Sequence, residues 1–446
     1  PIKVSQAYYC EDPFLNQLGV NPVFNLLTST LDDNRKENRT LHLMSEEDAL
    51  SKVQKYLHRQ GIDRLSPIAR KVEREGTPNR RNVVLVFMES MSANLMGTFG
   101  SDKKLTPYLD SLYQQSLSFS HFYSSGIHTN HGIYSTLYSF PAIMKRNAMK
   151  GSVIPVYSGL PTVLQENGYC NLFFMTHESQ YDNMNAFLRT NGFDEIYAQE
   201  NYPSEKVVNS FGVQDDFMYQ YALPILNERA GTGNPFFSVL LSISNHPPYV
   251  IPPYFHPHSD VLEEQIVEYA DWSIRQFMQA AEKQPWFDNT IFVFLGDHGK
   301  MVGTPECEMP QSYNHIPLMI YGEDIKPGVY DGFGGQVDVS PTLLGLLNIS
   351  YLQNNFGVNL LEEERPCMFF TADNLIGARD SVNMFIYSPD SQQEFKYKLE
   401  EGKLHAATGT DEEAFRNLKD YCFSMLQSTE SLVKEHKTLD KVSVKK

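Results

Sequence analysis

The chain has 446 residues, of which 41% are hydrophobic, and a formal net charge of −17. This length indicates roughly two to three structural units, or one large α/β domain with appendages. The acidic balance argues against a nucleic-acid partner, which would need a basic stripe on the surface.

Residues 1–77 are polar and carry runs of charge, and we expect them to form a helical linker or arm on the main domain. Residues 45–60, "SEEDALSKVQKYLHRQ", read as an amphipathic helix with Ser45 as N-cap. The chain starts with Pro1 rather than Met, and its apolar runs are too short to cross a bilayer. We therefore expect a piece of a longer protein, following a removed membrane segment.

From residue 82 onward, short apolar runs alternate with helical patterns. Uniformly apolar runs are typical of parallel strands buried on both faces. The expected strands are 82–88, 171–176, 236–243, 290–296 and 316–322. The expected helices are 106–116, the segment after Thr129, 159–168, 261–284 and 339–348. This alternation predicts a mostly parallel central sheet with helices on both faces, in a catalytic domain over residues 78–365.

The pattern changes after residue 365. Residues 367–373, 382–388 and 394–407 look like antiparallel strands, and 411–435 looks like a final helix. We expect a small C-terminal α+β subdomain over residues 366–446. The five cysteines form no Cys-x-x-Cys pair, which disfavours a zinc–thiolate site. A Cys307–Cys367 or Cys170–Cys367 bridge stays open.

Polar residues follow two of the expected strands directly. Glu89 ends "VFMES", and Asp297 and His298 end "FLGDHG". Active sites of open α/β sheets form at the carboxyl ends of strands. A Glu/Asp/His set suits Zn²⁺ or Mn²⁺. Taken alone, Glu89 reads more readily as an ordinary strand-end carboxylate than as a ligand.

The stretch "SSGIHTNHGIYSTLYS" (124–139) places Thr129 at the start of an expected helix. Thr129 is either an N-cap or a nucleophile. A bound metal would lower the pKa of its hydroxyl, as it does for bound water. The flanking His128 and His131 either donate to a phosphate or face solvent.

The order Glu89, Thr129, Asp297–His298 resembles the sulfatase-like branch of the alkaline phosphatase superfamily. The chain looks most like the extracellular domains of lipoteichoic acid synthases and of phosphoglycerol or phosphoethanolamine transferases. Further matching pieces, in order over residues 82–362, are "FYSSGIHTNHG", "MTHESQYDNMNAF", "SISNHPPY", "GQVDVSPTLLGLLNI" and "FGVNLL". The resemblance implies an alkaline-phosphatase-like fold.

The resemblance also implies residue roles. The implied metal ligands are Glu89, Thr129, Asp297 and His298, with Thr129 as the nucleophile. His177 and His246 would line the phosphate pocket, and His246 or His315 would act as acid or base. His315 matches a histidine near the metal in the phosphoethanolamine branch, and Asn183 would shape the pocket.

The sequence departs from the family in two places. The Cys/Ser-x-Pro-x-Arg motif of true sulfatases is absent around Thr129, so sulfatase activity is not expected. Lipoteichoic acid synthases carry a Trp and an Arg where this chain has Asp182 and Met184. Losing that Arg removes a bidentate phosphate clamp, which disfavours glycerol phosphate as the substrate. Arg189 is a candidate replacement.

The predicted function is a metal-dependent phosphotransferase. It would move a phospho-head group of the phosphoglycerol or phosphoethanolamine type from a phospholipid to a glycan or lipid acceptor through a phospho-threonine. The implied cofactor is one divalent metal, Mn²⁺ or Zn²⁺, with Mg²⁺ and a second metal left open. The expected location is the cell membrane, with the catalytic domain on the extracellular or periplasmic side. The alternatives are a hydrolase of phosphodiesters, phosphonates or sulfate esters at the same site, and a catalytically inactive binding module.

Overall fold

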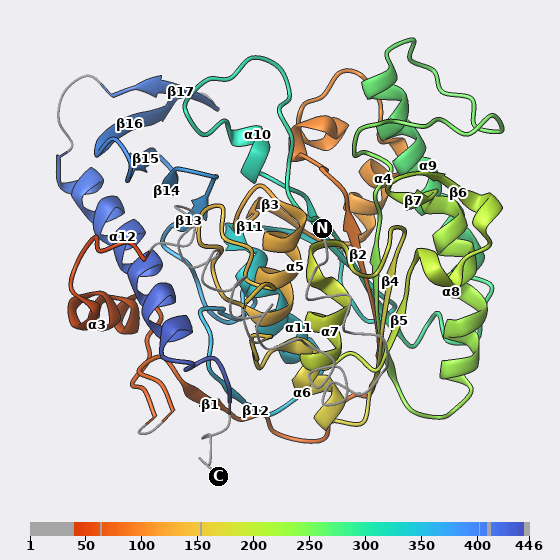
Figure 1. Ribbon diagram of the computed structural model, residues 1–446, viewed down its shortest axis with the longest axis horizontal. Coiled ribbons are helices and arrows are strands. Elements are labelled where there is room, and N and C mark those ends of the chain that lie inside the picture. The colour runs from red at the N-terminus through yellow and green to blue at the C-terminus, as the bar shows by residue number, and fades with distance from the viewer. Residues whose placement is uncertain (1–39, 63–64, 152–153, 401, 408–411, 441–446) are drawn as a thin grey trace, which may run out of the picture.

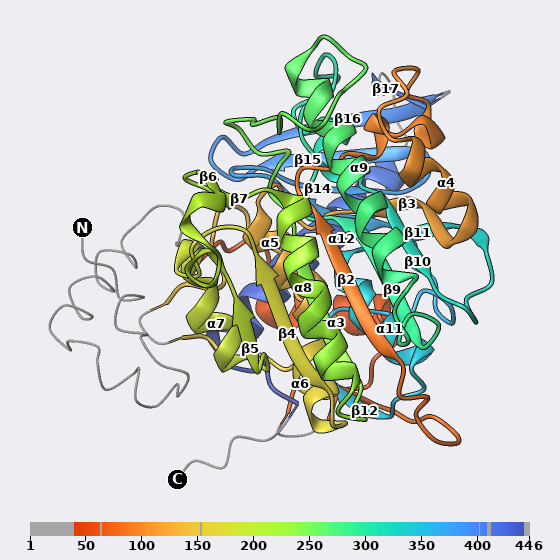
Figure 2. The same ribbon diagram turned by 90° about the vertical axis from the view of Figure 1, so that its right-hand side faces the viewer.

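The computed structural model describes residues 40–62, 65–151, 154–400, 402–407 and 412–440. Within these residues, eight strands form a central sheet that carries helices on both faces (Figures 1 and 2). In order across the sheet, the strands are β11 (Gly328–Gly335), β3 (Leu117–Tyr123), β10 (Leu318–Tyr321), β9 (Thr290–Gly296), β2 (Asn82–Met88), β8 (Phe236–Leu241), β4 (Cys170–Met175) and β5 (Glu195–Tyr197). This confirms the predicted mostly parallel sheet.

One strand of this sheet runs against the others. β10 pairs antiparallel with both β3 and β9, whereas the remaining neighbours pair in parallel. The prediction of a parallel strand at 316–322 is therefore wrong in direction, because a short apolar run does not encode which way the chain passes through a sheet. The sequence pattern also did not identify β3, whose apolar residues are interrupted by Ser118, Ser120 and His121.

The strand β2 shows why the sheet is buried on both faces. Val83, Leu85 and Phe87 lie in the core on one face, and Val84 and Val86 lie in the core on the other. The helices on the first face are α5 (Thr129–Tyr138), α6 (Leu160–Glu166), α7 (Met184–Thr190) and α11 (Val339–Leu346). Those on the second face are α4 (Pro107–Gln115), α8 (Asp215–Ala230) and α9 (Leu262–Ala281). Because both faces are covered, the strand reads as a continuous apolar run.

Two of these helices have no clear sequence signal. α8 contains Pro224 and has little amphipathic periodicity, and α7 follows directly on two residues with positive φ, Asp182 and Asn183. Pro224 and the absent periodicity remove the usual signs of a helix. The remaining short elements are β1 (Arg70–Val72) paired with β12 (Tyr351–Gln353), β6 (Val207–Asn209) paired with β7 (Gly212–Val213), α10 (Gln311–Asn314) and the 3-10 turn η8 (Gln336–Asp338).

The C-terminal part is a separate antiparallel sheet covered by one long helix, which confirms the predicted α+β subdomain (Figure 1). Its strands are β13 (Met368–Thr371), β14 (Ile376–Arg379), β15 (Asn383–Ser388), β16 (Gln393–Glu400) and β17 (Lys403–Ala406), and its helix is α12 (Glu412–Lys434). The N-terminal helix α3 (Glu46–Tyr56) packs against α12. Ser45 caps α3 as predicted, since its Oγ accepts the Asp48 N–H at 3.2 Å.

Residues 1–39 of the predicted arm lie outside the described residues. No helix of the described ranges is both long and apolar enough to cross a membrane. Cys170, Cys307, Cys367 and Cys422 are free thiols, so neither bridge that the sequence left open is formed.

Candidate functional site

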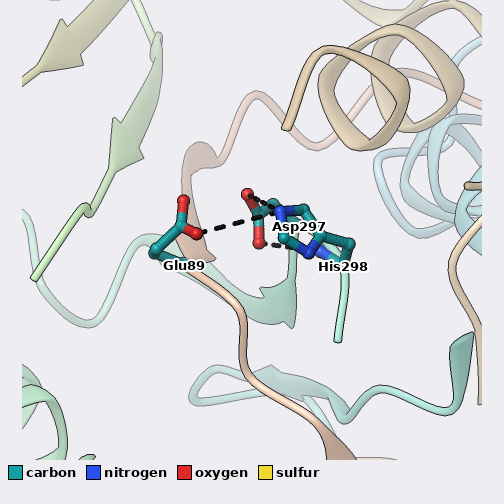
Figure 3. Close-up of side chains that lie close together, drawn as sticks. All are labelled: Glu89, Asp297 and His298. Atoms are coloured by element: carbon teal, nitrogen blue, oxygen red, sulfur yellow. Dashed lines mark hydrogen bonds and ion pairs between the residues drawn. The ribbon is translucent and has the colours of Figure 1, made fainter. Parts of the chain in front are cut away.

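The parallel register of β2 and β9 sets the two carboxylates side by side. Met88 pairs with Gly296, so Glu89 and Asp297 leave the sheet together at its carboxyl edge. Figure 3 shows the side chains of Glu89, Asp297 and His298 converging from these two strand ends. One ligand atom of each lies within 4.8 Å of the others. The structure thus brings together three of the four predicted metal ligands.

The two carboxylates are buried next to one another, with exposed fractions of 1% for Glu89 and 0% for Asp297. Burial and the negative charge of Asp297 raise the pKa of Glu89 well above its usual value. Asp297 Oδ1 accepts the backbone N–H groups of Ser90 (2.8 Å) and His298 (2.7 Å), while its buried Oδ2 has no hydrogen-bond partner. A buried carboxylate pair with an unsatisfied oxygen is the environment that a cation stabilises.

The imidazole of His298 completes this environment. Its Nδ1 lies 2.8 Å from the Gly299 carbonyl, which can only accept, so Nδ1 carries the proton. In the neutral ring Nε2 is then the nitrogen with a free lone pair, and it lies 3.5 Å from Asp297 Oδ2 and 3.8 Å from Glu89 Oε1. A backbone carbonyl that fixes the ring in this way is typical of metal-binding histidines. The donor set therefore fits a divalent cation.

Thr129 is the first residue of α5, and its hydroxyl lies 3.5 Å from Glu89 Oε2. The N-cap of α5 is His128, whose carbonyl accepts the N–H groups of His131 and Gly132. The interpretation of Thr129 as an N-cap is therefore wrong: the helix begins one residue earlier than that role requires. The Thr129 hydroxyl faces the carboxylate cluster instead.

Two contacts hold α5 against the end of β9. A Cβ atom on Gly132 would lie 2.2 Å from the Asp297 carbonyl oxygen, so helix and strand end touch through backbone. The side-chain amide of Gln336 donates to the carbonyls of Asp297 (2.7 Å) and Gly296 (3.1 Å) and accepts from Ser125 N–H (2.9 Å). Gln336 thereby joins the segment before Thr129 to the strand that carries Asp297.

The two predicted pocket histidines belong to one row of aromatic rings. The ring centroids of His177 and Tyr181 are 4.9 Å apart, those of Tyr181 and Phe211 6.1 Å, and those of Phe211 and His246 4.2 Å. Each histidine places Nδ1 against a carbonyl, at 2.9 Å for His177 and 2.6 Å for His246. Nε2 is therefore the nitrogen left to face a ligand in each ring. Burial lowers the pKa of His177.

The predicted residues near 183 are engaged with the protein itself. Asn183 donates to the Met149 carbonyl at 2.8 Å. Asp182 accepts from Asn130 (3.1 Å), the residue after Thr129, and from Lys150 (2.9 Å). Arg189, the candidate phosphate clamp, bonds Asn185 within α7 and the Asp194 carbonyl, so the structure does not direct it to Thr129.

His315 lies apart from the carboxylate cluster. Its Nε2 donates to the Ser120 carbonyl at 2.9 Å, and its ring packs on Phe99 and Tyr123. Burial lowers its pKa to about 4. Of the described His, Cys, Asp and Glu residues, only Glu89, Asp297 and His298 form such a cluster, and His315 does not join them.

Lys300 is a site residue that the sequence reasoning missed. Its Nζ donates to Asn245 Oδ1 at 2.6 Å, and the Asn245 amide donates to the carbonyls of Glu89 (3.1 Å) and Ser90 (3.2 Å). Burial lowers the pKa of Lys300 to about 8. Its position two residues after His298, in "GDHGK", was the available signal. It brings a positive charge to the loop next to His246.

A family model described as Sulfatase matches residues 81–349. The chain is 25% identical over 362 residues to the lipoteichoic acid synthase-like YvgJ of Bacillus subtilis (strain 168), covering 74% of this chain and 56% of that protein. It is 24% identical over 400 residues to the lipoteichoic acid synthase of Staphylococcus aureus (strain NCTC 8325 / PS 47), covering 79% and 58%. The chain thus spans little more than half the length of these curated relatives.

Solved structures share the fold. A protein in the alkaline phosphatase superfamily from Vibrio parahaemolyticus superposes with a TM-score of 0.80 at 25% identity, over 89% of this chain and 97% of that one. The lipoteichoic acid synthase LtaP from Listeria monocytogenes gives 0.69 at 21% identity, over 86% and 98%. These likenesses confirm the predicted alkaline-phosphatase-like fold. With the family model matching more than half of its length, the chain belongs to the sulfatase family, within the alkaline phosphatase superfamily.

Proposed function

We propose that this chain is a metal-dependent phosphotransferase that moves a phospho-head group from a phospholipid to a glycan or lipid acceptor through a phosphorylated Thr129. The observation that carries the proposal is the Thr129 hydroxyl, 3.5 Å from Glu89 within the Glu89, Asp297 and His298 cluster. The likeness to lipoteichoic acid synthases supports transfer of a phosphoglycerol-type group, and a phosphoethanolamine-type group is the second candidate. It also supports action at the outer side of the cell membrane.

The cluster would hold one divalent cation, Mn²⁺ or Zn²⁺ by its donor set, which supplies Lewis acidity and lowers the pKa of the Thr129 hydroxyl. Glu89, Asp297 and His298 provide the donors. The negative charge of the buried carboxylate pair would repel a phosphate group as long as no cation is bound. Binding of the phosphate therefore depends on binding of the cation.

In the first half-reaction, the ionised Thr129 Oγ1 attacks phosphorus, and the bond from phosphorus to the lipid alcohol breaks. The N-terminus of α5 points backbone N–H groups at the phosphate. Lys300 adds positive charge beside the equatorial oxygens, which is the main electrostatic task in phosphoryl transfer. His246 gives a proton to the departing alcohol.

In the second half-reaction, the acceptor hydroxyl attacks the phospho-threonine. His246 takes the proton of that hydroxyl, and Thr129 Oγ1 leaves in its ionised form, so the cycle closes with protons balanced. The row His177, Tyr181, Phe211 and His246 forms the wall along which the head group would lie. Water in place of the alcohol would give hydrolysis at the same site.

The test uses vesicles that contain a fluorescent phosphatidylglycerol or phosphatidylethanolamine, with Mn²⁺ or Zn²⁺ and with or without an alcohol acceptor. We expect release of fluorescent diacylglycerol, an intact-mass adduct on Thr129, and product attached to the acceptor. Thr129→Ala should abolish both release and adduct, whereas Thr232→Ala, at an exposed turn, should not. A phospho-adduct in Thr129→Ala, or full activity after dialysis against a chelator, would contradict the proposal. Equal turnover with and without acceptor would identify a hydrolase instead.

A further inference from the structure

The segment before the nucleophile is held from the C-terminal subdomain. We call residues 124–128, which lead from β3 into α5, the nucleophile loop. Thr371, the last residue of β13, donates its N–H to the Ser125 carbonyl at 2.9 Å, and its hydroxyl lies 3.3 Å from the same oxygen. Two residues later, Asp373 Oδ1 lies 2.5 Å from His128 Nε2. Two points of the nucleophile loop, Ser125 and His128, are therefore attached to the same end of β13.

These attachments continue into the carboxylate cluster. Ser125 N–H donates to Gln336, and Gln336 donates to the Asp297 carbonyl. The nucleophile loop thus lies between β13 on one side and the end of β9 on the other. β13 contacts β11, and Figure 1 shows β13 on the side of the central sheet where the C-terminal subdomain lies.

The contact with Asp373 acts at the residue that fixes where α5 begins. The His128 carbonyl accepts the N–H groups of His131 (2.9 Å) and Gly132 (3.2 Å), and Thr129 follows immediately. A rotation of His128 would therefore turn the first residue of α5 and move the Thr129 hydroxyl relative to Glu89. The bond from its imidazole to Asp373 restrains the position of His128 at the start of the helix.

The small energy expected of the His128–Asp373 contact distinguishes a role in positioning Thr129 from a role in stabilising the fold. The side chains of His128 and Asp373 are 40% and 42% exposed, so packing alone does not immobilise them. Even as an ion pair, a contact this exposed would contribute only about 0–1 kcal/mol to stability. Misplacing a reacting group by about 1 Å costs about 100-fold in rate. The bond therefore contributes little to the free energy of unfolding but much to the position of the Thr129 hydroxyl.

We propose that Asp373 is a positioning residue, which holds His128 and through it Thr129, so that the C-terminal subdomain supplies a part of the catalytic device. This inference rests on the proposed role of Thr129 as nucleophile. It makes the small domain necessary for turnover although none of its residues is a predicted metal ligand.

The experiment measures metal-loaded wild-type and variant proteins with bis(p-nitrophenyl) phosphate and follows adduct formation on Thr129 by intact mass. We expect Asp373→Asn and Asp373→Ala to lower kcat and the rate of adduct formation by about 10-fold or more, with KM changed less than about twofold and the urea midpoint unchanged. Asp373→Glu, which keeps the carboxylate, should recover part of kcat. The matched control is Asp380→Asn, in the same subdomain. The carboxylate of Asp380 accepts hydrogen bonds from Val382 and Asn383, in its own turn.

A double-mutant cycle makes the test specific. If Asp373 acts through His128, then His128→Gln should lower kcat similarly and the double variant should be no worse than either single one. Wild-type kcat in Asp373→Ala, additive losses, or an equal loss in Asp380→Asn would each overturn the inference. If the proposed function itself is wrong, the result differs, because Thr129→Ala would then keep its activity and would form as much adduct as the wild-type protein.

Discussion

Gly132→Ala should separate the nucleophile from the carboxylate cluster. The added Cβ would meet the Asp297 carbonyl oxygen at 2.2 Å, whereas ordinary contacts begin at 3.4 Å, so α5 and the end of β9 must move apart by about 1.2 Å. Neither partner can rotate away, because both are backbone and the same carbonyl accepts from Gln336. Alanine would favour the helix by only about 0.5–1 kcal/mol. The clash therefore decides the outcome.

A displacement of this size predicts a loss of about 100-fold in kcat/KM, or about 2.7 kcal/mol of transition-state stabilisation. The assay is turnover of bis(p-nitrophenyl) phosphate by metal-loaded protein, with metal content measured by elemental analysis and the fold checked by circular dichroism. Gly328→Ala is the matched control, since a Cβ there meets nothing within 4 Å. Activity of Gly132→Ala within threefold of wild type would refute the reasoning.

Three further predictions concern other groups. The Arg365 guanidinium donates two hydrogen bonds of 2.7 Å to the fully buried Asp338, so Arg365→Met leaves that carboxylate without its counter-charge. We expect urea unfolding to show that the free energy of unfolding falls by about 3–5 kcal/mol. The control Asp324→Asn should lower it by less than about 1 kcal/mol, because the Asp324 carboxylate is 82% exposed. Burial holds the pKa of His315 at about 4, below its ordinary 6.5. The stability that its neutral form contributes is therefore complete above pH 6.5 and is lost as the pH falls toward 4. His315→Gln should lower the slope of the free energy of unfolding against pH in this window by about one proton, and parallel curves for variant and wild type would contradict this. Lys300→Met should lower kcat/KM by about 10- to 100-fold while Lys300→Arg retains part of it, and equal losses in both would argue against a role for the charge.

The carboxylate cluster was predictable because the strands that carry it are unambiguous. β2 and β9 are buried over their whole length, so their apolar runs end sharply at Glu89 and Asp297. Parallel strands share a carboxyl edge, and the actual register pairs Met88 with Gly296. Two residues separated by more than 200 positions could therefore be placed together without any tertiary information.

The rest of the site depends on contacts that local sequence does not encode. The imidazole of His128, the N-cap of α5, contacts Asp373, which is 245 positions away in the turn between β13 and β14. His315 has the residue type of a ligand, but the turn before β10 points its ring at the Ser120 carbonyl. Lys300 carries in the sequence only the signal of its place after His298, and its link to Glu89 through Asn245 is visible only in the fold. In each case the partner, rather than the residue, determines the role.

The reversed direction of β10 determines where the segment between β9 and β10 runs. Because β10 enters the sheet at the edge where β9 leaves it, the chain from Asp297 to Pro317 stays at one end of the molecule and never crosses the core. Such an excursion can lengthen, shorten or be exchanged without shifting the register of any strand. It begins with two residues of the carboxylate cluster, Asp297 and His298. Its middle can therefore vary while Glu89 and Asp297 keep their places at the ends of β2 and β9.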